Sequence, residues 1–315
     1  MHTSSYFSAL GILLCAIQTV GADIPFYEYN VPPTRPMAAT ALGTIGFGPI
    51  NECSGIVQSR QFPGVFWVHN DSGDWPRIFA IRQDGTIIKP TDEKNYRGVV
   101  VEGASNRDWE DIATDAEGNL IIADIGNNQN SRRDLTLYTI KEPDPTKVTS
   151  ASVTRSIRVY YPEQKEFPPK KNNFDCEAMF TARGAIYLIT KHRADANAVL
   201  YRVPMTVAET AAPVALERLS AFVSNEMVTG ADCSPDGRRL IVLTYDGVWG
   251  FECKGEQGEW FAGQARFYPV RKLQGEAICW DGPERIIMTN EKRDIVMLKW
   301  SEIPVVSVKG VDRIP

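Results

Sequence analysis

The sequence predicts an all-β protein: a single β-propeller of five blades, each with four antiparallel strands. Two observations lead to this class. A strand, turn, strand pattern recurs five times with a spacing of roughly 45 to 65 residues, and such a period is typical of propellers. Helix-like periodicity is scarce, since MTVAET (205–210) is at most a short helical turn in a loop.

The five copies begin at Glu52, Asp108, Asp175, Met227 and Gln274. Each copy has a polar residue, then a small or acidic one, an apolar one, and a turn rich in Gly, Asp or Pro. An apolar run follows, which predicts the second strand. These runs are VFWV, LIIA, IYLI, LIVL and RIIM. Third strands are predicted at RIFAI (77–81), LTLYTI (135–140), VLYRV (199–203), VWGFE (248–252) and IVMLKW (295–300).

Fourth strands are predicted from further alternating segments, SIRVYY (156–161), ALERLSAF (215–222) and QARFYPV (264–270). The last copy has no fourth strand of its own, whereas MAATALGTIGF (37–47) is a strand-like segment without a blade. We therefore expect this N-terminal strand to complete the last blade and close the ring. Six blades are the alternative, because the gap from Ile81 to Asp108 has room for more strands. EFPPKKNNF (166–174) is expected to be a loop between the second and third blades.

The N-terminus is typical of a signal peptide. An apolar run over residues 7–17 precedes small residues three positions apart, ending at Ala22. The prediction is a signal peptide at 1–22, a propeller domain at 23–315, and a secreted or periplasmic location; an anchored N-terminus is the alternative. No other stretch reaches the length of a membrane span, so none is expected in the mature chain.

Composition excludes some functions. The 315 residues carry a net charge of −5 and a pI near 5.4, which gives no general attraction to nucleic acid. Five cysteines follow the signal peptide at irregular spacing and without zinc-site patterns. We expect them to be buried small hydrophobic residues with at most one or two disulfides.

The first strands of the five copies carry a ring of polar residues. The innermost strands of a propeller run side by side around the axis, so residues at equal phase face it together. Carboxylates two residues earlier, in Glu52, Asp108 and Asp175, should point the same way. The ring positions are Ser54, Glu110, Glu177, Thr229 and Glu276.

Six carboxylates near one axis repel unless a positive charge joins them. Oxygen ligands without histidine or thiolate favour a hard cation, and an adaptable site favours calcium over magnesium. The prediction is one Ca²⁺ on the axis; a merely solvated channel is the alternative. Asp111, at the alternate phase, is expected to make a structural hydrogen bond, and Trp109 to pack between blades.

The loops after the second strands should surround the channel mouth, where a rigid scaffold presents functional groups. Rim acids that could act as a general base are Asp71, Asp124 and Asp246. Side chains suited to phosphate or carboxylate recognition are Asn127, Asn128, Arg132, Lys191, Arg193 and Arg293. The alternative for each cation is a solvated surface charge.

The motifs ECSGIVQ, WEDIA, CEAMF and QGEAI resemble the calcium-activated apyrases, soluble five-bladed nucleotidases with one calcium on the axis. The resemblance implies that Ser54, Glu110, Glu177 and Glu276 are calcium ligands, with Thr229 where the family has serine. The rim loops at 69–71 and 124–128 do not match the catalytic elements of that family. DWEDI and ADIGNN are also similar to secreted bacterial propellers and to phytase-like and lactonase-like propellers, which also centre on calcium.

The first functional hypothesis is an exported calcium-dependent hydrolase of phosphoanhydrides or phosphate esters, acting on a small anionic substrate. Lactonase or esterase activity is a further option, although no GxSxG motif supports a serine nucleophile. The alternative is a non-catalytic propeller with a structural cation, whose rim binds a polysaccharide, a peptide or a protein. Propellers serve both purposes, so the fold does not decide between them.

Overall fold

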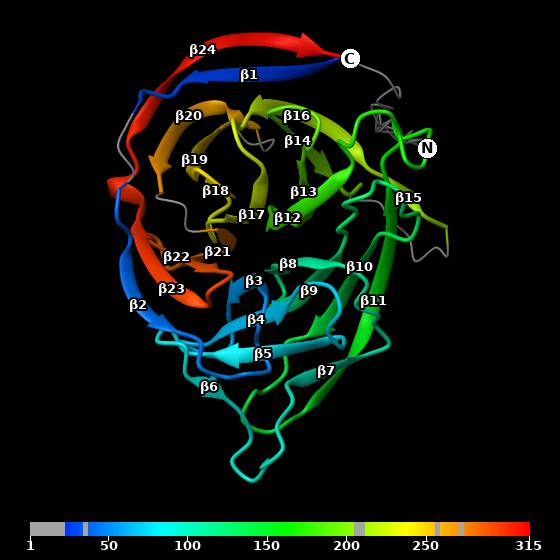
Figure 1. The fold of residues 1–315 in the computed structure, drawn as a ribbon, viewed down its shortest axis with the longest axis vertical. Coiled ribbons are helices and arrows are strands. Elements are labelled where there is room, and N and C mark those ends of the chain that lie inside the picture. The colour runs from blue at the N-terminus through cyan, green and yellow to red at the C-terminus, as the bar shows by residue number, and fades with distance from the viewer. Residues whose placement is uncertain (1–22, 34–36, 205–211, 256–258, 271–273) are drawn as a thin grey trace, which may run out of the picture.

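The chain forms a β-propeller, with strands arranged around a central axis (Figure 1). The computed structural model describes residues 23–33, 37–204, 212–255, 259–270 and 274–315. Within these ranges the fold is all-β, apart from one turn of 3-10 helix, η1, at Trp300–Glu302. No helix among these residues is long and apolar enough to cross a membrane. The predicted signal peptide and the MTVAET segment lie outside the described residues.

One sheet contains the first two repeats. Its strand order is β3-β4-β5-β7-β11-β10-β9-β8, with β6 beside β5 and β15 beside β11. The first repeat supplies β3 Cys53–Gln58, β4 Phe66–Asn70, β5 Arg77–Ile81, β6 Ile87–Ile88 and β7 Val99–Glu102. The second supplies β8 Trp109–Thr114, β9 Asn119–Asp124, β10 Thr136–Lys141 and β11 Ser150–Tyr160, and β15 is Val214–Ala215. The strands in the 81–108 gap, β6 and β7, pair with β5 and so extend the first repeat.

A second sheet contains the third and fourth repeats, in the order β12-β13-β14-β16-β1-β24-β20-β19-β18-β17. The third repeat has β12 Asp175–Ala182, β13 Ala185–Lys191, β14 Asn197–Arg202 and β16 Glu217–Val223. The fourth has β17 Val228–Cys233, β18 Arg239–Thr244, β19 Gly247–Lys254 and β20 Glu259–Pro269. The predicted fourth strands are therefore confirmed as β11, β16 and β20, and residues 166–174 form the expected loop.

The third sheet joins the two ends of the repeat series. Its order is β2-β23-β22-β21, with β2 Thr40–Thr44, β21 Gly275–Asp281, β22 Arg285–Asn290 and β23 Asp294–Lys299. β2 pairs antiparallel with β23, in the register Thr40 to Met297. The predicted pairing of this N-terminal segment with the last repeat is confirmed.

The terminal strands form a ribbon that the sequence patterns did not predict. β1 Ile24–Asn30 pairs antiparallel with β24 Val305–Ile314, and the two run together along the outside of the propeller (Figure 1). β1 also pairs with β16, and β24 pairs with β20, so the ribbon joins the outer edges of the third and fourth repeats. These outer edges are thereby covered, which removes unpaired backbone groups.

Apolar side chains fill the spaces between neighbouring repeats. Trp109 is fully buried among Trp67, Ile78 and Tyr138, which confirms that it packs between blades. Between the third and fourth repeats, Phe222 and Trp249 pack edge to face at 5.4 Å. The five cysteines after residue 22 are all free; Cys253 is half-buried and the other four are buried, as expected for small hydrophobic residues.

Candidate metal centre and channel mouth

The predicted ring positions all lie at β-bulges. The innermost strands β3, β8, β12, β17 and β21 lie side by side around the axis, and in each the pairing register breaks at one residue. A bulge leaves one residue unpaired and turns its side chain out of the regular alternation. The residues at the breaks are Ser54, Glu110, Glu177, Thr229 and Glu276.

Three carboxylates form a compact cluster near the axis. Asp71 follows β4, Asp108 precedes β8, and Glu110 lies at the bulge of β8; each offers an oxygen within 4.8 Å of the others. Glu110 is only 3% exposed, and the other two are half-buried. Among the described residues, no ion pair within 4 Å reaches any of the three. The cluster therefore has the charge and the ligand atoms that a hard cation requires.

Burial and mutual repulsion make ionisation of this cluster unfavourable. Burial, and then the charges of Glu177 and Asp71, raise the pKa of Glu110 well above its usual range. Burial, and then the charge of Asp71, raise the pKa of Asp108 to about 6. A bound cation would relieve the same repulsion that protons relieve.

The other side of the axis is neutralised by cations of the chain itself. The Lys191 ammonium, 4% exposed, donates to the Glu177 carboxylate and, at 3.1 Å, to the Tyr245 hydroxyl. Arg193 binds Asp175 at 2.9 Å and also reaches Glu177 at 3.5 Å. Arg193 further donates to the side chain of Asn128. Positive groups thus lie beside the uncompensated acid cluster.

The remaining predicted ligands make other contacts. The hydroxyl of Ser54 donates to the Glu110 carbonyl at 3.2 Å, and that of Thr229 donates to the Gly275 carbonyl at 2.7 Å. Glu276 is half-buried, and burial raises its pKa to about 7 while Lys191 opposes the rise. Of the five predicted ligands, only Glu110 belongs to the compact cluster. Asp71, predicted as a catalytic general base, also lies in this cluster.

Several predicted rim residues hold the 124–132 loop in place. Asp124 forms an ion pair with Arg132 at 2.9 Å and accepts a hydrogen bond from the Asp108 main chain at 3.0 Å. Asn127 accepts from the Arg132 main chain at 2.9 Å, and its own N–H donates to Asp175 at 2.7 Å. These contacts hold the backbone of the 124–132 loop next to Asp108.

Two further rim predictions lie apart from this loop. Arg293 has a φ of 68° and donates to the Ile50 carbonyl at 3.4 Å. Asp246 accepts from the Thr244 hydroxyl at 2.7 Å and lines a cleft beside the channel mouth. The sequence placed all these residues on the rim; Asp124 and Asp246 bind partners in their own repeats, whereas Arg293 binds a carbonyl of another segment.

Gly126 packs directly against the carboxylates of Glu110 and Asp108. An ideal Cβ on this residue would lie 2.0 Å from Oε1 of Glu110 and 2.5 Å from Oδ2 of Asp108. We expect Gly126→Ala to displace both carboxylates and weaken calcium binding about tenfold, a change of about 1.4 kcal/mol. Calcium titration followed by thermal unfolding measures this. Gly46→Ala is the control, because a Cβ there meets nothing within 4 Å; equal calcium affinities of the two variants would contradict the assignment.

Two more carboxylates lie deeper along the axis. Asp111, 1% exposed, accepts hydrogen bonds from the main chain of Met179 at 2.8 Å and of Ala231 at 3.4 Å. It thereby joins three inner strands, and its predicted structural role is confirmed. Asp232 accepts from the Trp280 main chain at 2.9 Å and joins the next strand in the same way.

Asp232 gives the stability of the protein a pH dependence. Burial raises its pKa from the ordinary value to about 7, so the folded state holds a proton that the unfolded state releases from about pH 4 upward. Its contribution to stability is complete at low pH and is lost as the pH rises through about 7. With chelator present, Asp232→Asn should therefore lose less stability than the wild type between pH 5 and 8. Urea unfolding tests this, and Asp92→Asn, an exposed aspartate, should follow the wild type.

A scan against protein-family models finds no matching family, and a search of the curated proteins finds no match. Solved structures do match in fold. The virginiamycin B lyase from Staphylococcus aureus with quinupristin is 13% identical, with a TM-score of 0.39, over 78% of this chain and 66% of that one. This match therefore spans slightly less than two thirds of the lyase.

Two other structures are similar to the same degree. The PQQ-bound aldose sugar dehydrogenase from Streptomyces coelicolor is 10% identical, with a TM-score of 0.44, over 88% of this chain and all of the other. The Cps50 (Swd1) β-propeller domain of Myceliophteria thermophila is 12% identical, with a TM-score of 0.40, over 78% and 82% of the two chains. These are likenesses of fold alone. The resemblance to the calcium-activated apyrases stays a prediction.

Proposed function

We propose that this protein is an exported, calcium-dependent hydrolase of phosphoanhydrides or phosphate esters. The observation that carries the proposal is the cluster of Asp71, Asp108 and Glu110, which makes no ion pair within 4 Å among the described residues and has the ammonium of Lys191 near enough to act on the charge of Asp71. A cation and a phosphate group would each find charges of opposite sign there. Export rests on the predicted signal peptide at 1–22, which leaves the mature chain 23–315.

We also propose that the propeller has five blades. Each of five innermost strands lies beside the next, from β3 through β8, β12, β17 and β21 back to β3. Each is followed outward by further antiparallel strands, and β2 supplies the outer strand after β23. The strands in the 81–108 gap pair with β5, so they do not supply a sixth unit.

Calcium is the cation that suits the cluster. All the offered atoms are carboxylate oxygens, which hard cations prefer, and irregular oxygen sets with room for water suit calcium better than magnesium. Asp71, Asp108 and Glu110 would hold the ion, with Glu276 and the Ser54 hydroxyl as the next oxygens around the axis. A bound calcium would supply charge that polarises a phosphoryl oxygen.

The residues of the chain would do the rest of the chemistry. Lys191 and Arg193 would hold the phosphate oxygens, since ammonium and guanidinium groups bind phosphate well. Arg193, which is the more exposed of the two, would meet the ligand first. Asp71, on the rim loop after β4, is positioned to accept the proton of an attacking water.

The test combines stability with turnover on the mature chain, residues 23–315. After chelation, graded calcium should raise the melting temperature, and the same calcium should be required for phosphate release from a panel of nucleotides, pyrophosphate and phytate. Stabilisation without any turnover, on this panel or on lactones and esters, would overturn the enzyme assignment and favour the binding propeller. The absence of both effects would overturn the proposed function altogether.

A further inference from the structure

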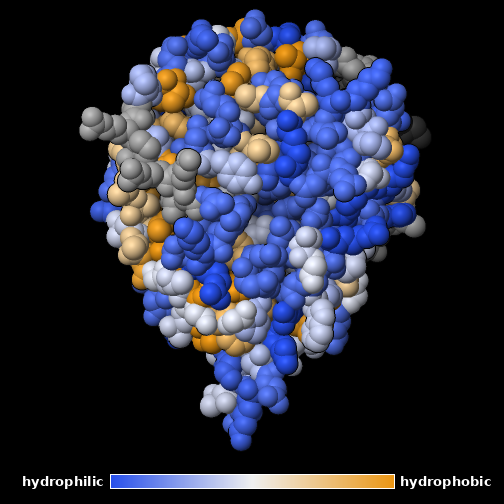
Figure 2. Space-filling model, in the orientation of Figure 1, coloured by the Kyte–Doolittle hydropathy of each residue, from blue (hydrophilic) through white to orange (hydrophobic). Residues whose placement is uncertain are grey.

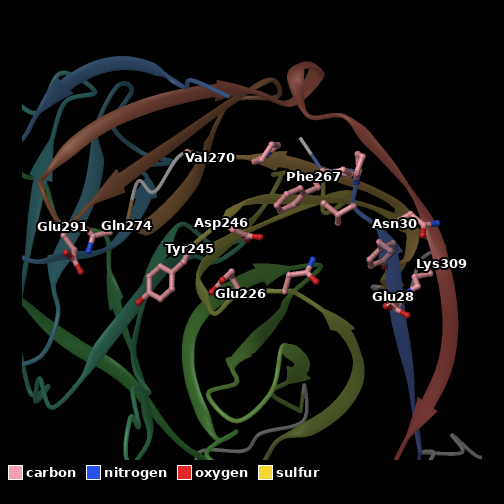
Figure 3. A pocket seen from close by; sticks show the side chains of 16 residues that line it. Glu28, Asn30, Glu226, Tyr245, Asp246, Phe267, Val270, Gln274, Glu291 and Lys309 are labelled. Atoms are coloured by element: carbon pink, nitrogen blue, oxygen red, sulfur yellow. Dashed lines mark hydrogen bonds and ion pairs between the residues drawn. The ribbon is translucent and has the colours of Figure 1, made fainter. Parts of the chain in front are cut away.

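A cleft of about 1230 Å³ lies between the channel mouth and the terminal ribbon (Figure 3). We call it the ribbon cleft. At its axial end are Gln274 and Glu291; Glu226 and Asp246 are in the middle; Glu28 is at the ribbon end. The face seen in Figure 2 is mainly hydrophilic, in keeping with a surface that binds polar ligands. The lining extends from the channel mouth to the terminal ribbon, which suits an extended ligand.

Negative charge predominates in the ribbon cleft. Its described lining contains the carboxylates of Glu28, Glu226, Asp246 and Glu291 and a single ammonium group, that of Lys309. This ammonium is already bound to Glu28 at 2.6 Å. No ion pair within the described part of the chain involves the other three acids. Three carboxylates that form no ion pair with any described residue therefore face one concave surface, where the charges reinforce each other.

Apolar groups line the same cleft between the acids. Tyr29 and Phe267 present ring atoms, and Pro32, Pro269 and Val270 add aliphatic surface. The ring of Tyr29 is held in place because its hydroxyl donates a hydrogen bond to the Phe261 carbonyl. Such a lining would remove the methylene groups of a bound ligand from water. This burial stabilises the complex by about 25 cal/mol per Å² of buried apolar area.

We propose that the ribbon cleft binds an extended organic cation, a chain of methylene groups that carries protonated amines. The carboxylates would bind the ammonium groups, and the apolar lining would contact the hydrocarbon between them. An anionic chain would be repelled by the three acids, and a neutral sugar would leave their charges uncompensated. The proposal does not depend on a cation at the axis or on phosphate hydrolysis.

Tyr245 separates the two sites. It lines the ribbon cleft, while its hydroxyl accepts the hydrogen bond from Lys191 on the axial side. A polyamine could also be drawn to the axial acids, so the two locations have to be tested separately. The structure offers variants for each: Glu226→Gln and Asp246→Asn in the cleft, and Glu110→Gln at the axis.

The experiment is calorimetric titration of the mature chain with spermidine, in low salt and with calcium present at 1 mM, roughly physiological for exported proteins. Glu226→Gln should weaken spermidine binding about threefold, and the double variant with Asp246→Asn about tenfold or more. Glu226 is exposed, so its substitution leaves folding intact. Glu110→Gln and Glu117→Gln should bind spermidine like the wild type.

Three results would overturn the proposal. One is the absence of spermidine binding by the wild type. Another is binding that Glu110→Gln abolishes but the cleft variants leave unchanged, which would place the amine at the axis. The third is tight binding of maltotetraose that survives the double variant, which would make the cleft a sugar site. If the axial calcium site fails, comparison of Glu110→Gln with the cleft variants still distinguishes amine binding at the axis from amine binding in the ribbon cleft.

Discussion

Glu110→Gln is expected to abolish the proposed calcium-dependent stabilisation of the protein and to lower the proposed phosphate turnover about a hundredfold, the order of loss that follows removal of a group that stabilises charge at a reacting centre. Glu110 is the most buried carboxylate of the axial cluster, and glutamine keeps its size but removes its charge. The wild type should gain about 2.7 kcal/mol at a hundredfold excess of calcium over its dissociation constant, and the variant should gain almost none of it.

The stability of Glu110→Gln without calcium distinguishes a loss of calcium binding from a loss of folding. The raised pKa of Glu110 means that its ionised form destabilises the fold as the pH rises. With chelator at pH 8, Glu110→Gln should therefore be at least as stable as the wild type. Glu117→Gln is the matched control, because Glu117 is exposed in the turn between β8 and β9. A variant that unfolds more easily in chelator, or that keeps its response to calcium, would be evidence against the cluster.

Lys191→Met should lower the stability of the chelated protein by about 3 kcal/mol, because it leaves the buried carboxylate of Glu177 with only the more distant Arg193, at 3.5 Å, as a counter-charge. The ammonium of Lys191 is 4% exposed and Glu177 is 8% exposed, so neither charge is replaced by water. The Tyr245 hydroxyl loses a donor as well. Urea unfolding at pH 8 measures the loss.

Two further variants identify the origin of the stability loss in Lys191→Met. Adding Glu177→Gln to Lys191→Met should restore most of the stability, because both charges are then removed together. Lys147→Met removes an exposed ion pair with Asp144 and should cost less than about 1 kcal/mol. If Lys191→Met cost no more than Lys147→Met, Lys191 would not be the counter-charge of the axis.

The repeats were predictable because their signals are local. Alternating apolar residues and Gly, Asp or Pro turns define each hairpin without reference to the rest of the chain, so the five copies match one another and occupy equivalent positions around the axis. The bulges at Glu110 and its equivalents were not visible in the sequence. The ring prediction still placed these residues together, because all five copies contain the same bulge and the shift is common to them.

What the sequence could not predict depends on contacts between distant segments. The ribbon consists of β1 and β24, which come from opposite ends of the chain. Because no turn connects them, the local sequence does not indicate that they pair. Lys191 and Arg193 were expected at the rim, and their pairing with Glu177 and Asp175 of the adjacent strand depends on side-chain geometry that the sequence does not show. The axial charge is thus divided: the chain neutralises one side itself and leaves Asp71, Asp108 and Glu110 for a cation.

Calcium titration by calorimetry at pH 6, in buffers with different ionisation enthalpies, tests that division most directly. We predict that each chain binds one calcium ion. Binding should release protons, because the pKa of Asp108 is raised to about 6 and that of Glu110 is also raised. Glu110→Gln should bind none in the same range. No heat of binding from the wild type, or a site that survives Glu110→Gln, would contradict a calcium centre on this axis.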